Sequence, residues 1–425
     1  MRRGVLVHSA AELVTMAGPA RARGGPEMAE LATTSDGAVA CLDERIVAVG
    51  PTSDVRTRLR TDETLRGVSW DEVDAGGRSV TPGLIDPHTH LPFAGSREGE
   101  LTLRQRGASY LEILAAGGGI LSTVAATRAA SEDQLAKAAR AWLDVMVAAG
   151  VTTIEAKSGY GLETDTELRQ LRVLHRLSDE GPIEIVPTLL AAHAVPPEFD
   201  GRHDAYIDQV AAPLATEAAR AGLARFVDAF CEDGVFSAEQ SRRALAAGVA
   251  AGLIVRVHAD ELRPSGGAVL AAEMAAASAD HLGAVDDAGI RALASAEGRT
   301  VATLLPITSL YLGLAPAPAR RLVHARVPIA IGTDFNPGTS PSPSLPFAMG
   351  LARVTLGLTF AQALTAVTIN AAAALRMADR IGSLEEGKQA DLVVWRVPRA
   401  EQIPYWIGAS LVERVVKRGE VVFRA

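Results

Sequence analysis

Histidine and acidic residues recur at the ends of apolar segments of this sequence, where they could bind a metal ion. The stretch DPHTH (86–90) follows the apolar run 80–85, and strand alternation would place His88 and His90 on one face. His258 and Asp334 each follow another apolar run. Three imidazoles and one carboxylate can bind one divalent metal ion and leave a position for water. The alternative is that the two histidines merely cap a strand.

The segments that would position these residues alternate between strand and helix patterns. Apolar or β-branched runs occur at 81–90, 151–158, 183–193, 224–233, 253–260, 277–283, 300–306 and 328–338. Helical patterns lie between them, for example at 131–149, 164–178, 237–251, 265–276 and 285–296. Eight strands separated by helices predict an α/β fold, a (β/α)8 TIM barrel.

The active site of such a barrel lies at the carboxyl ends of its strands. Five of the nine histidines fall at those ends, namely His88, His90, His193, His258 and His281. Asp260, Glu261, Asp280 and Asp334 accompany them. The remaining histidines are scattered over strand, helix and loop patterns, and we interpret them as surface or satisfied polar residues: His8, His175, His203 and His324.

Both ends of the chain show strand patterns without intervening long helices. Residues 37–50 are typical of two short strands around an Asp-Glu turn, and 390–395 and 411–423 show similar patterns. Neither end is long enough to form a domain alone. We therefore expect 1–80 and 376–425 to form one small β-sandwich domain, with 81–375 as the barrel.

The bulk properties exclude several classes of protein. The chain has 425 residues, 48% of them hydrophobic, a mean hydropathy of +0.16 and a formal net charge of −8. It has no long basic run, which argues against nucleic acid or an anionic membrane as partner. We expect no transmembrane helix, no signal peptide and, with two cysteines, no disulfide framework. These properties predict a cytoplasmic protein.

Several longer motifs resemble the amidohydrolase superfamily: PGLIDPHTH (82–90), VHAD (257–260), GTD (332–334) and GSLEEGKQADLVVW (382–395). Finer motifs extend the resemblance over nearly the whole chain: HTHLPFAGSRE, GGGILSTVAATR, EAKSGYGL, FCEDGVF, HADEL and GTDFNPGTSPSPS. The resemblance implies a metal-dependent hydrolase on a distorted (β/α)8 barrel with a small β-sandwich built from both chain ends. It further implies opening of the cyclic amide of 4-imidazolone-5-propanoate to N-formimidoyl-L-glutamate, a step of histidine degradation.

The same resemblance implies roles for individual residues. His88, His90, His258 and Asp334 would bind one zinc or iron ion, and Asp334 would also take a proton from water. Glu261 would act as general acid and base, its alternative being a solvated loop carboxylate. His281 would polarise the carbonyl or stabilise the oxyanion, and its alternative is a fifth metal ligand.

The substrate carries a propionate, so the pocket needs a cation. Arg97 is suited to bind a carboxylate through its guanidinium, although most arginines of this chain are expected at the surface. The resemblance assigns the remaining contacts with substrate or product to Tyr160, His193, Glu261, Asn336, Gly338 and Thr339. Tyr110 would lie near the substrate or pack in a helix. A homodimer is expected from the family and from the commonness of two-fold assemblies.

Lys157 and Cys231 also fall at the ends of predicted strands. Lys157 is one of only four lysines among 42 basic residues, and we hypothesise that its ammonium orients a carboxylate at the site. The predicted fourth strand ends in Cys231-Glu232-Asp233, without a lysine that could bridge two metals, which favours a single metal ion. Cys231 is interpreted as a buried structural thiol rather than a ligand.

Two other functions are compatible with parts of this pattern. A related amidohydrolase could deaminate a heterocycle, but Arg97 and GTDFNPG (332–338) argue against it. A non-catalytic assembly protein on the same barrel would be expected to lack metal ligands, whereas the full set is present here. Release of ammonia would distinguish a deaminase from a ring-opening hydrolase.

Overall fold

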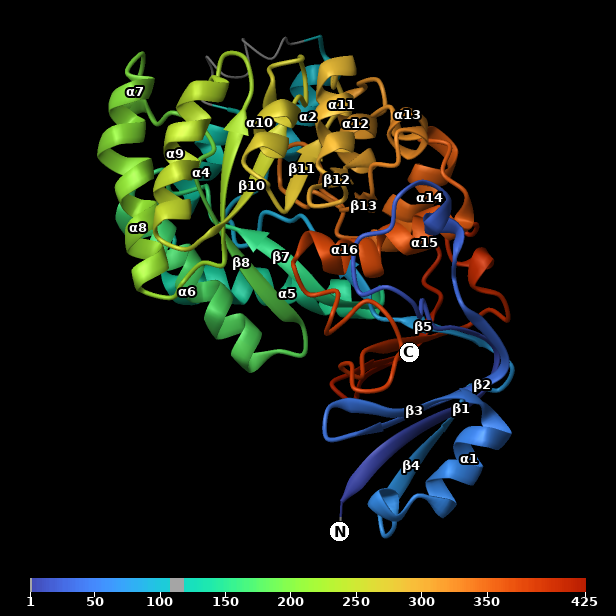
Figure 1. Ribbon diagram of the computed structural model, residues 1–425. Coiled ribbons are helices and arrows are strands. Elements are labelled where there is room, and N and C mark those ends of the chain that lie inside the picture. The colour runs from blue at the N-terminus through green and yellow to red at the C-terminus, as the bar shows by residue number, and fades with distance from the viewer. Residues whose placement is uncertain (1, 108–117) are drawn as a thin grey trace.

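A computed structural model describes residues 2–107 and 118–425, and Figure 1 shows two sheets joined into one body. One eight-stranded sheet has the order β13-β12-β11-β10-β9-β8-β7-β6, with parallel pairing between neighbours. Its strands are β6 (Leu84–Asp86), β7 (Val151–Lys157), β8 (Glu184–Ala192), β9 (Phe226–Cys231), β10 (Ile254–Ala259), β11 (Ser278–His281), β12 (Val301–Leu304) and β13 (Ile329–Ile331).

The first and last strands of this sheet approach each other just beyond their ends. The His90 amide donates to the Phe335 carbonyl at 3.0 Å, and the Asp334 amide donates to the His88 carbonyl at 3.0 Å. These bonds bring the segments after β6 and β13 together and nearly close the barrel. The predicted TIM barrel is thereby confirmed.

Helices surround the barrel, as Figure 1 shows for α5 to α11. Several begin at reciprocal caps, such as Ser131 with Gln134 before α5 and Ser237 with Gln240 before α9. The helices are α2 (Glu98–Gln105), α4 (Ile120–Ala129), α5 (Glu132–Ala148), α6 (Thr164–Glu180), α7 (His203–Tyr206), α8 (Ala212–Arg220), α9 (Ala238–Ala250), α10 (Gly267–Glu273), α11 (Asp287–Ser295), α12 (Pro306–Leu312), α13 (Ala319–His324), α14 (Leu345–Thr355), α15 (Phe360–Ala366) and α16 (Ile369–Ala374).

The strands of the two chain ends form a second sheet, in the order β16-β15-β14-β5-β1-β2-β3, with β4 paired to β1. They are β1 (Arg3–Val14), β2 (Thr33–Leu42), β3 (Arg45–Pro51), β4 (Ser69–Asp74), β5 (Ser79–Pro82), β14 (Leu392–Trp395), β15 (Val412–Lys417) and β16 (Glu420–Arg424). Val5 and Val39 of the N-terminal strands share an apolar cluster with Val394 and Val416 of the C-terminal strands, so both chain ends contribute to the core of this sheet.

The N-terminal segment also contains α1 (Thr52–Thr61), which the strand patterns did not predict. Val55 and Leu59 of this helix pack on Leu6, Ala38 and Ala48, the face of the sheet opposite the shared cluster. A polar sequence with one buried and one partly buried apolar side chain, Val55 and Leu59, carries a weak helical signal, and tertiary packing decides whether the helix forms. Among the described residues, no helix is long and apolar enough to cross a membrane.

Candidate metal centre and active site

The predicted metal ligands lie together at the carboxyl end of the barrel. His88 and His90 follow β6, His258 lies within β10, and Asp334 follows β13. All four are at most 3% exposed. Asp334 has a φ of +55°, a left-handed conformation that is uncommon for a non-glycine residue and often accompanies a functional site. The fold therefore gathers these residues from three strands that are distant in sequence.

Ligand atoms of the four residues face one another at short range. The Nε2 atom of His90 lies 3.3 Å from Nε2 of His88, 3.4 Å from Nε2 of His258 and 3.1 Å from Oδ1 of Asp334. The Asp334 oxygen is also 3.4 Å from Nε2 of His88. Ligand atoms about 2.0–2.1 Å from one metal ion lie roughly 2.9 Å apart at right angles and roughly 3.3 Å apart at tetrahedral angles. The arrangement fits a single divalent cation.

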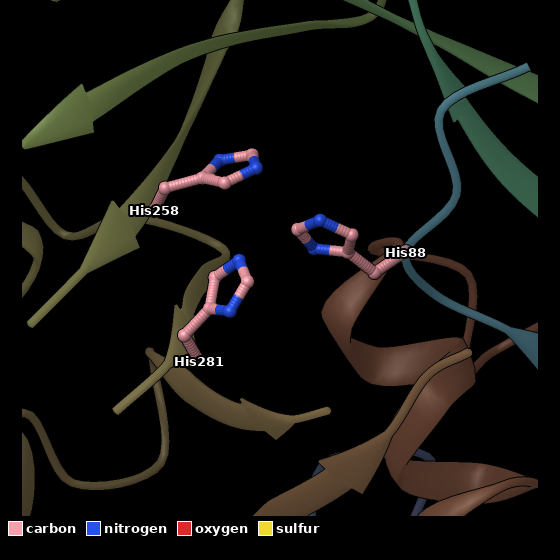
Figure 2. A group of neighbouring side chains, drawn as sticks. All are labelled: His88, His258 and His281. Carbon is pink, nitrogen blue, oxygen red and sulfur yellow. The ribbon is translucent and has the colours of Figure 1, made fainter. Parts of the chain in front are cut away.

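His281 belongs to the same group of imidazoles. One ring nitrogen each of His88, His258 and His281 lie within 4.8 Å of one another, as do ligand atoms of His88, His90 and Asp334. Figure 2 shows the rings of His88, His258 and His281 turned toward a common space. From this position His281 can contact a substrate at the metal centre or serve as a fifth metal ligand.

The pKa values of Asp334 and His88 are shifted by burial and by contacts with neighbouring charged groups. Burial favours a neutral Asp334, but its hydrogen bonds with His88 and His90 and the charge of His281 outweigh it and hold its pKa well below the usual range. For His88, burial and Lys157 lower the pKa, whereas Asp280 raises it, and the balance is a pKa of about 9. A cation would compete directly with the proton on this imidazole.

Glu261 lies beside His281, with 3.7 Å between Oε1 of Glu261 and Nδ1 of His281. Its side chain is only 13% exposed, which excludes the solvated loop carboxylate. Burial raises the pKa of Glu261, and the positive charge of His281 only partly offsets this. Both residues line a narrow cavity with Thr308 and Leu305, and Thr308 donates to Asp334 Oδ2 at 2.5 Å. A buried carboxylate of raised pKa is suited to proton transfer.

Arg97 lies at the same end of the barrel and is held in place by Glu100. Its Nε and Nη2 atoms donate to the two Glu100 carboxylate oxygens at 2.9 and 2.8 Å, and Glu100 also accepts from the Gly119 amide. The Arg97 side chain is 11% exposed, so it is not an ordinary surface arginine. The Nη1 side of the Arg97 guanidinium packs on Gly338, and a Cβ atom at position 338 would overlap with Nη1 of Arg97.

Asn336, Gly338 and Thr339 form one turn beneath Arg97. The Oδ1 atom of Asn336 accepts from the Gly338 amide at 2.9 Å and from the Thr339 amide at 2.8 Å. These two amides are therefore already paired within the turn. The guanidinium of Arg97 fills the space above Gly338, and the Thr339 hydroxyl contacts the Asn336 side chain, so this turn supports Arg97.

Tyr160 and His193 extend the aromatic wall next to His90. The rings of His90 and His193 stack with centroids 5.1 Å apart, and Tyr160 lies 5.4 Å from His193. Burial lowers the pKa of His193 to about 3 and raises that of Tyr160. The Gly159 carbonyl lies 2.9 Å from Nδ1 of His193, which places a proton on that nitrogen. Both side chains are neutral groups at neutral pH.

The other residues singled out in the sequence are placed as follows. Lys157 ends β7 in full burial, 2.7 Å from Glu155 and 3.1 Å from Asp228. Cys231 is buried with its pKa raised to about 11 by burial, and belongs to no ligand group among the described residues. Tyr110 lies outside the described residues. The other four histidines lie away from the ligand groups, in β1, α6, α7 and α13.

Charged residues inside the barrel strands are further functional candidates; of these the sequence indicated only Asp280, next to His281, and gave it no role. Glu155, Asp228, Arg256 and Asp280 are each at most 1% exposed; Asp280 contacts His88, Asp228 contacts His258, and Arg256 contacts Asp280. The available signal was a charged residue within an otherwise apolar strand, as in FVDAFC (226–231) and IVRVHA (254–259). A larger cavity of about 310 Å³, lined by Arg21, Glu27, Glu297 and Arg326 among others, shares no lining residue with this site.

Comparisons with known proteins agree with this architecture. The family model of the amidohydrolase family matches residues 79–422. The imidazolonepropionase of Geobacillus kaustophilus is 49% identical over 421 residues, which cover 99% of this chain and 98% of the relative. That of Symbiobacterium thermophilum is 49% identical over 420 residues, covering 98% and 97%.

Solved structures share the fold at lower identity. Guanine deaminase of E. coli superposes with a TM-score of 0.75 at 14% identity and covers 99% of both chains. A zinc-bound adenosine deaminase of Xanthomonas campestris superposes with a TM-score of 0.70 at 21% identity, covering 99% of this chain and 93% of its own. At these identities the likeness concerns the fold alone.

Proposed function

Because this chain belongs to the amidohydrolase family, with imidazolonepropionases among its full-length relatives, we propose that it hydrolyses 4-imidazolone-5-propanoate to N-formimidoyl-L-glutamate. The enzyme is a hydrolase of carbon–nitrogen bonds in cyclic amides. The observation that carries the proposal is the pairing of a four-residue metal centre with Arg97, a cation suited to the propionate.

One divalent metal ion, zinc or iron, is the proposed cofactor. His88, His90, His258 and Asp334 would hold it, and nitrogen and carboxylate ligands of this kind suit either metal. When bound, the ion supplies Lewis acidity that lowers the pKa of water toward neutrality. Elemental analysis of the purified protein identifies the metal.

The reaction adds one water molecule across the ring amide. A C–O bond forms at the ring carbonyl carbon, the C–N bond of the cyclic amide breaks, and the carbonyl becomes a carboxylate. Glu261 accepts a proton from water and returns it to the departing nitrogen, while Asp334 accepts a hydrogen bond from the same water. His281 donates to the carbonyl oxygen as negative charge develops there.

The propionate and the ring are recognised by different groups of the site. Arg97, held by Glu100, forms charge-assisted hydrogen bonds with the propionate carboxylate. Thr339 and Asn336 support the part of the site that binds the propionate. Tyr160 and His193 lie along the ring and remain neutral there, because burial lowers the pKa of His193 and raises that of Tyr160.

The function is tested with enzymatically prepared 4-imidazolone-5-propanoate. We expect loss of its ultraviolet absorbance with the holoenzyme, and little loss after treatment with a chelator. No ammonia should appear, because ring opening retains both nitrogens. Ammonia release from a panel of heterocycles, without turnover of the imidazolone, would instead identify a deaminase.

We also propose a cytoplasmic homodimer. The apolar side chains of Val354, Tyr405, Trp406 and Ile407 are 72%, 66%, 52% and 47% exposed. Exposed apolar groups of this size are typical of interaction surfaces, and two-fold assemblies are the commonest.

Both cysteines are free, as in proteins of a reducing compartment. Light scattering and cell fractionation test the two proposals, and Trp406→Glu should produce a monomer.

A further inference from the structure

Five charged residues form a layer directly beneath the candidate metal ligands. We call Glu155, Lys157, Asp228, Arg256 and Asp280 the buried charge layer. Each is at most 1% exposed, and together they come from β7, β9, β10 and β11. Burying ionised side chains is costly unless they are paired, and apolar residues of similar volume often stabilise a fold better. The layer therefore requires an explanation other than stability.

Two carboxylates of the layer contact the imidazoles on the side away from the ligand atoms. Oδ2 of Asp280 lies 2.8 Å from Nδ1 of His88. Oδ2 of Asp228 lies 3.0 Å from Nδ1 of His258, at an angle that does not meet the criteria for a hydrogen bond. Oδ1 of Asp228 accepts a hydrogen bond from the backbone amide of His258 at 3.2 Å. An ionised carboxylate only accepts, so these contacts favour a proton on each Nδ1 and leave Nε2 free for a metal ion.

The two cations of the layer hold these carboxylates in turn. Nζ of Lys157 lies 3.1 Å from Asp228 and 2.7 Å from Glu155. Nη2 of Arg256 donates to Asp280 at 2.9 Å and to the carbonyl of Pro87 at 2.7 Å. Arg256 thereby ties the partner of His88 to the residue that precedes His88 in the chain.

The charges of the layer do not cancel. Three carboxylates face two cations, so the layer has one net negative charge when all five are ionised. A negative layer below the ligands favours a divalent cation above it. His90 differs from its two neighbours, because carboxylates lie 2.8 and 3.0 Å from Nδ1 of His88 and His258, whereas the carboxylate contact of His90 within the described part of the chain is made through Nε2. The layer therefore acts selectively on His88 and His258.

We propose that Asp228 and Asp280 are positioning residues that hold His258 and His88 as Nδ1-protonated imidazoles, and that Lys157 and Arg256 position those two carboxylates. The layer thereby sets how tightly the metal ion is bound. This inference rests on the proposed metal centre, but it concerns residues to which no role has been given so far, apart from Lys157.

The test measures metal binding separately from catalysis. Asp228→Asn and Asp280→Asn are prepared with Asp391→Asn as the matched control, since Asp391 is a buried carboxylate that pairs with a buried lysine, Lys417, at 2.8 Å in the small sheet. Zinc affinity of each metal-free protein is determined by competition with a chromophoric chelator, and folding is checked by circular dichroism.

We expect zinc affinity to fall roughly 10- to 100-fold in the two layer variants and to stay at the wild-type value in Asp391→Asn. The visible spectrum of cobalt-substituted protein should change in the layer variants, because it reports the ligand geometry. Folded layer variants that bind zinc as tightly as the wild type would overturn the proposal. If the layer variants lose zinc affinity but the wild type does not turn over the imidazolone, the proposed function is refuted and the inference about the layer stands.

Two further measurements apply even if the asparagine variants do not fold. In zinc-loaded wild-type protein with ¹⁵N-labelled histidine, nuclear magnetic resonance should show Nδ1–H protons for His88 and His258, and a proton on Nε2 of either ring contradicts the proposal. Lys157→Arg should lower metal content, because a guanidinium does not fit between Glu155 and Asp228 as an ammonium does. Unchanged metal content and turnover in Lys157→Arg would rule out the proposed role of Lys157 in positioning Asp228.

Discussion

Gly338 lies directly beneath the guanidinium of Arg97, and the space that a Cβ at position 338 would need is occupied by Nη1 of that arginine. The turn of Asn336 fixes the backbone there, since its side chain accepts from the amides of both Gly338 and Thr339. The position of Arg97 over the site therefore depends on the absence of a side chain at residue 338.

This contact predicts the effect of Gly338→Ala. The added methyl group should displace Arg97, and we expect KM for the imidazolone to rise roughly 10- to 100-fold, the value of a charge-assisted hydrogen bond. Steady-state kinetics measure the effect. Gly99→Ala is the control, because a Cβ at this position in α2 meets no atom within 4 Å. An unchanged KM in Gly338→Ala would show that Arg97 does not bind the propionate.

Glu261→Gln should remove proton transfer without removing the metal ion. We expect kcat to fall roughly 100- to 10,000-fold, the usual contribution of a positioned acid or base, while zinc or iron content stays at the wild-type level. Atomic absorption on the same preparation provides the comparison. A variant that is inactive because it has lost its metal would place Glu261 among the ligands instead.

The raised pKa of Glu261 gives the reaction a characteristic pH dependence. The carboxylate accepts a proton only when it is ionised, so kcat/KM should rise with pH through the pKa of Glu261. Because burial raises that pKa above its ordinary value of 4.5, the acidic limb should lie above pH 4.5. Profiles of kcat/KM against pH are compared for the wild type and Glu261→Gln, and the variant should lack the rise of kcat/KM on the acidic side.

Lys417→Met should weaken the contact between the small sheet and the barrel. Lys417 of β15 is 3.4 Å from Thr153 and 3.3 Å from Glu184, both in barrel strands, and 2.8 Å from Asp391. Its removal leaves the buried Asp391 carboxylate without its lysine partner, although Glu184 keeps Arg380, and we expect a loss of about 3 kcal/mol in the free energy of unfolding. Urea denaturation measures this loss. Arg3→Met, at an exposed ion pair with Asp71, should have almost no effect.

Both cysteines should be unreactive in the native protein. Burial raises the pKa of Cys41 to about 12 and that of Cys231 to about 11, so neither forms appreciable thiolate at pH 8. A colorimetric thiol reagent should detect no thiol in the folded protein and two in denaturant. A thiol that reacts rapidly before unfolding would contradict the placement of Cys231 as a structural residue.

The sequence alone determined the barrel and the residues at its strand ends. Burial of both faces of parallel strands requires continuous apolar runs, and the local periods of strand and helix are readable without knowledge of contacts. For this reason His88, His90, His258 and Asp334 could be named as candidate ligands of one metal ion. Helix α1 was missed, because its burial depends on the sheet beneath it.

Only the tertiary structure decided which charged residues support the site. His88 and Asp280 are 192 positions apart, and no local pattern indicates that their side chains meet at 2.8 Å. The same holds for Arg97 above Gly338 and for Lys157 between Glu155 and Asp228. Periodicity specifies which face of an element is buried, whereas the partner on that face is specified by how distant strands pack around the barrel axis.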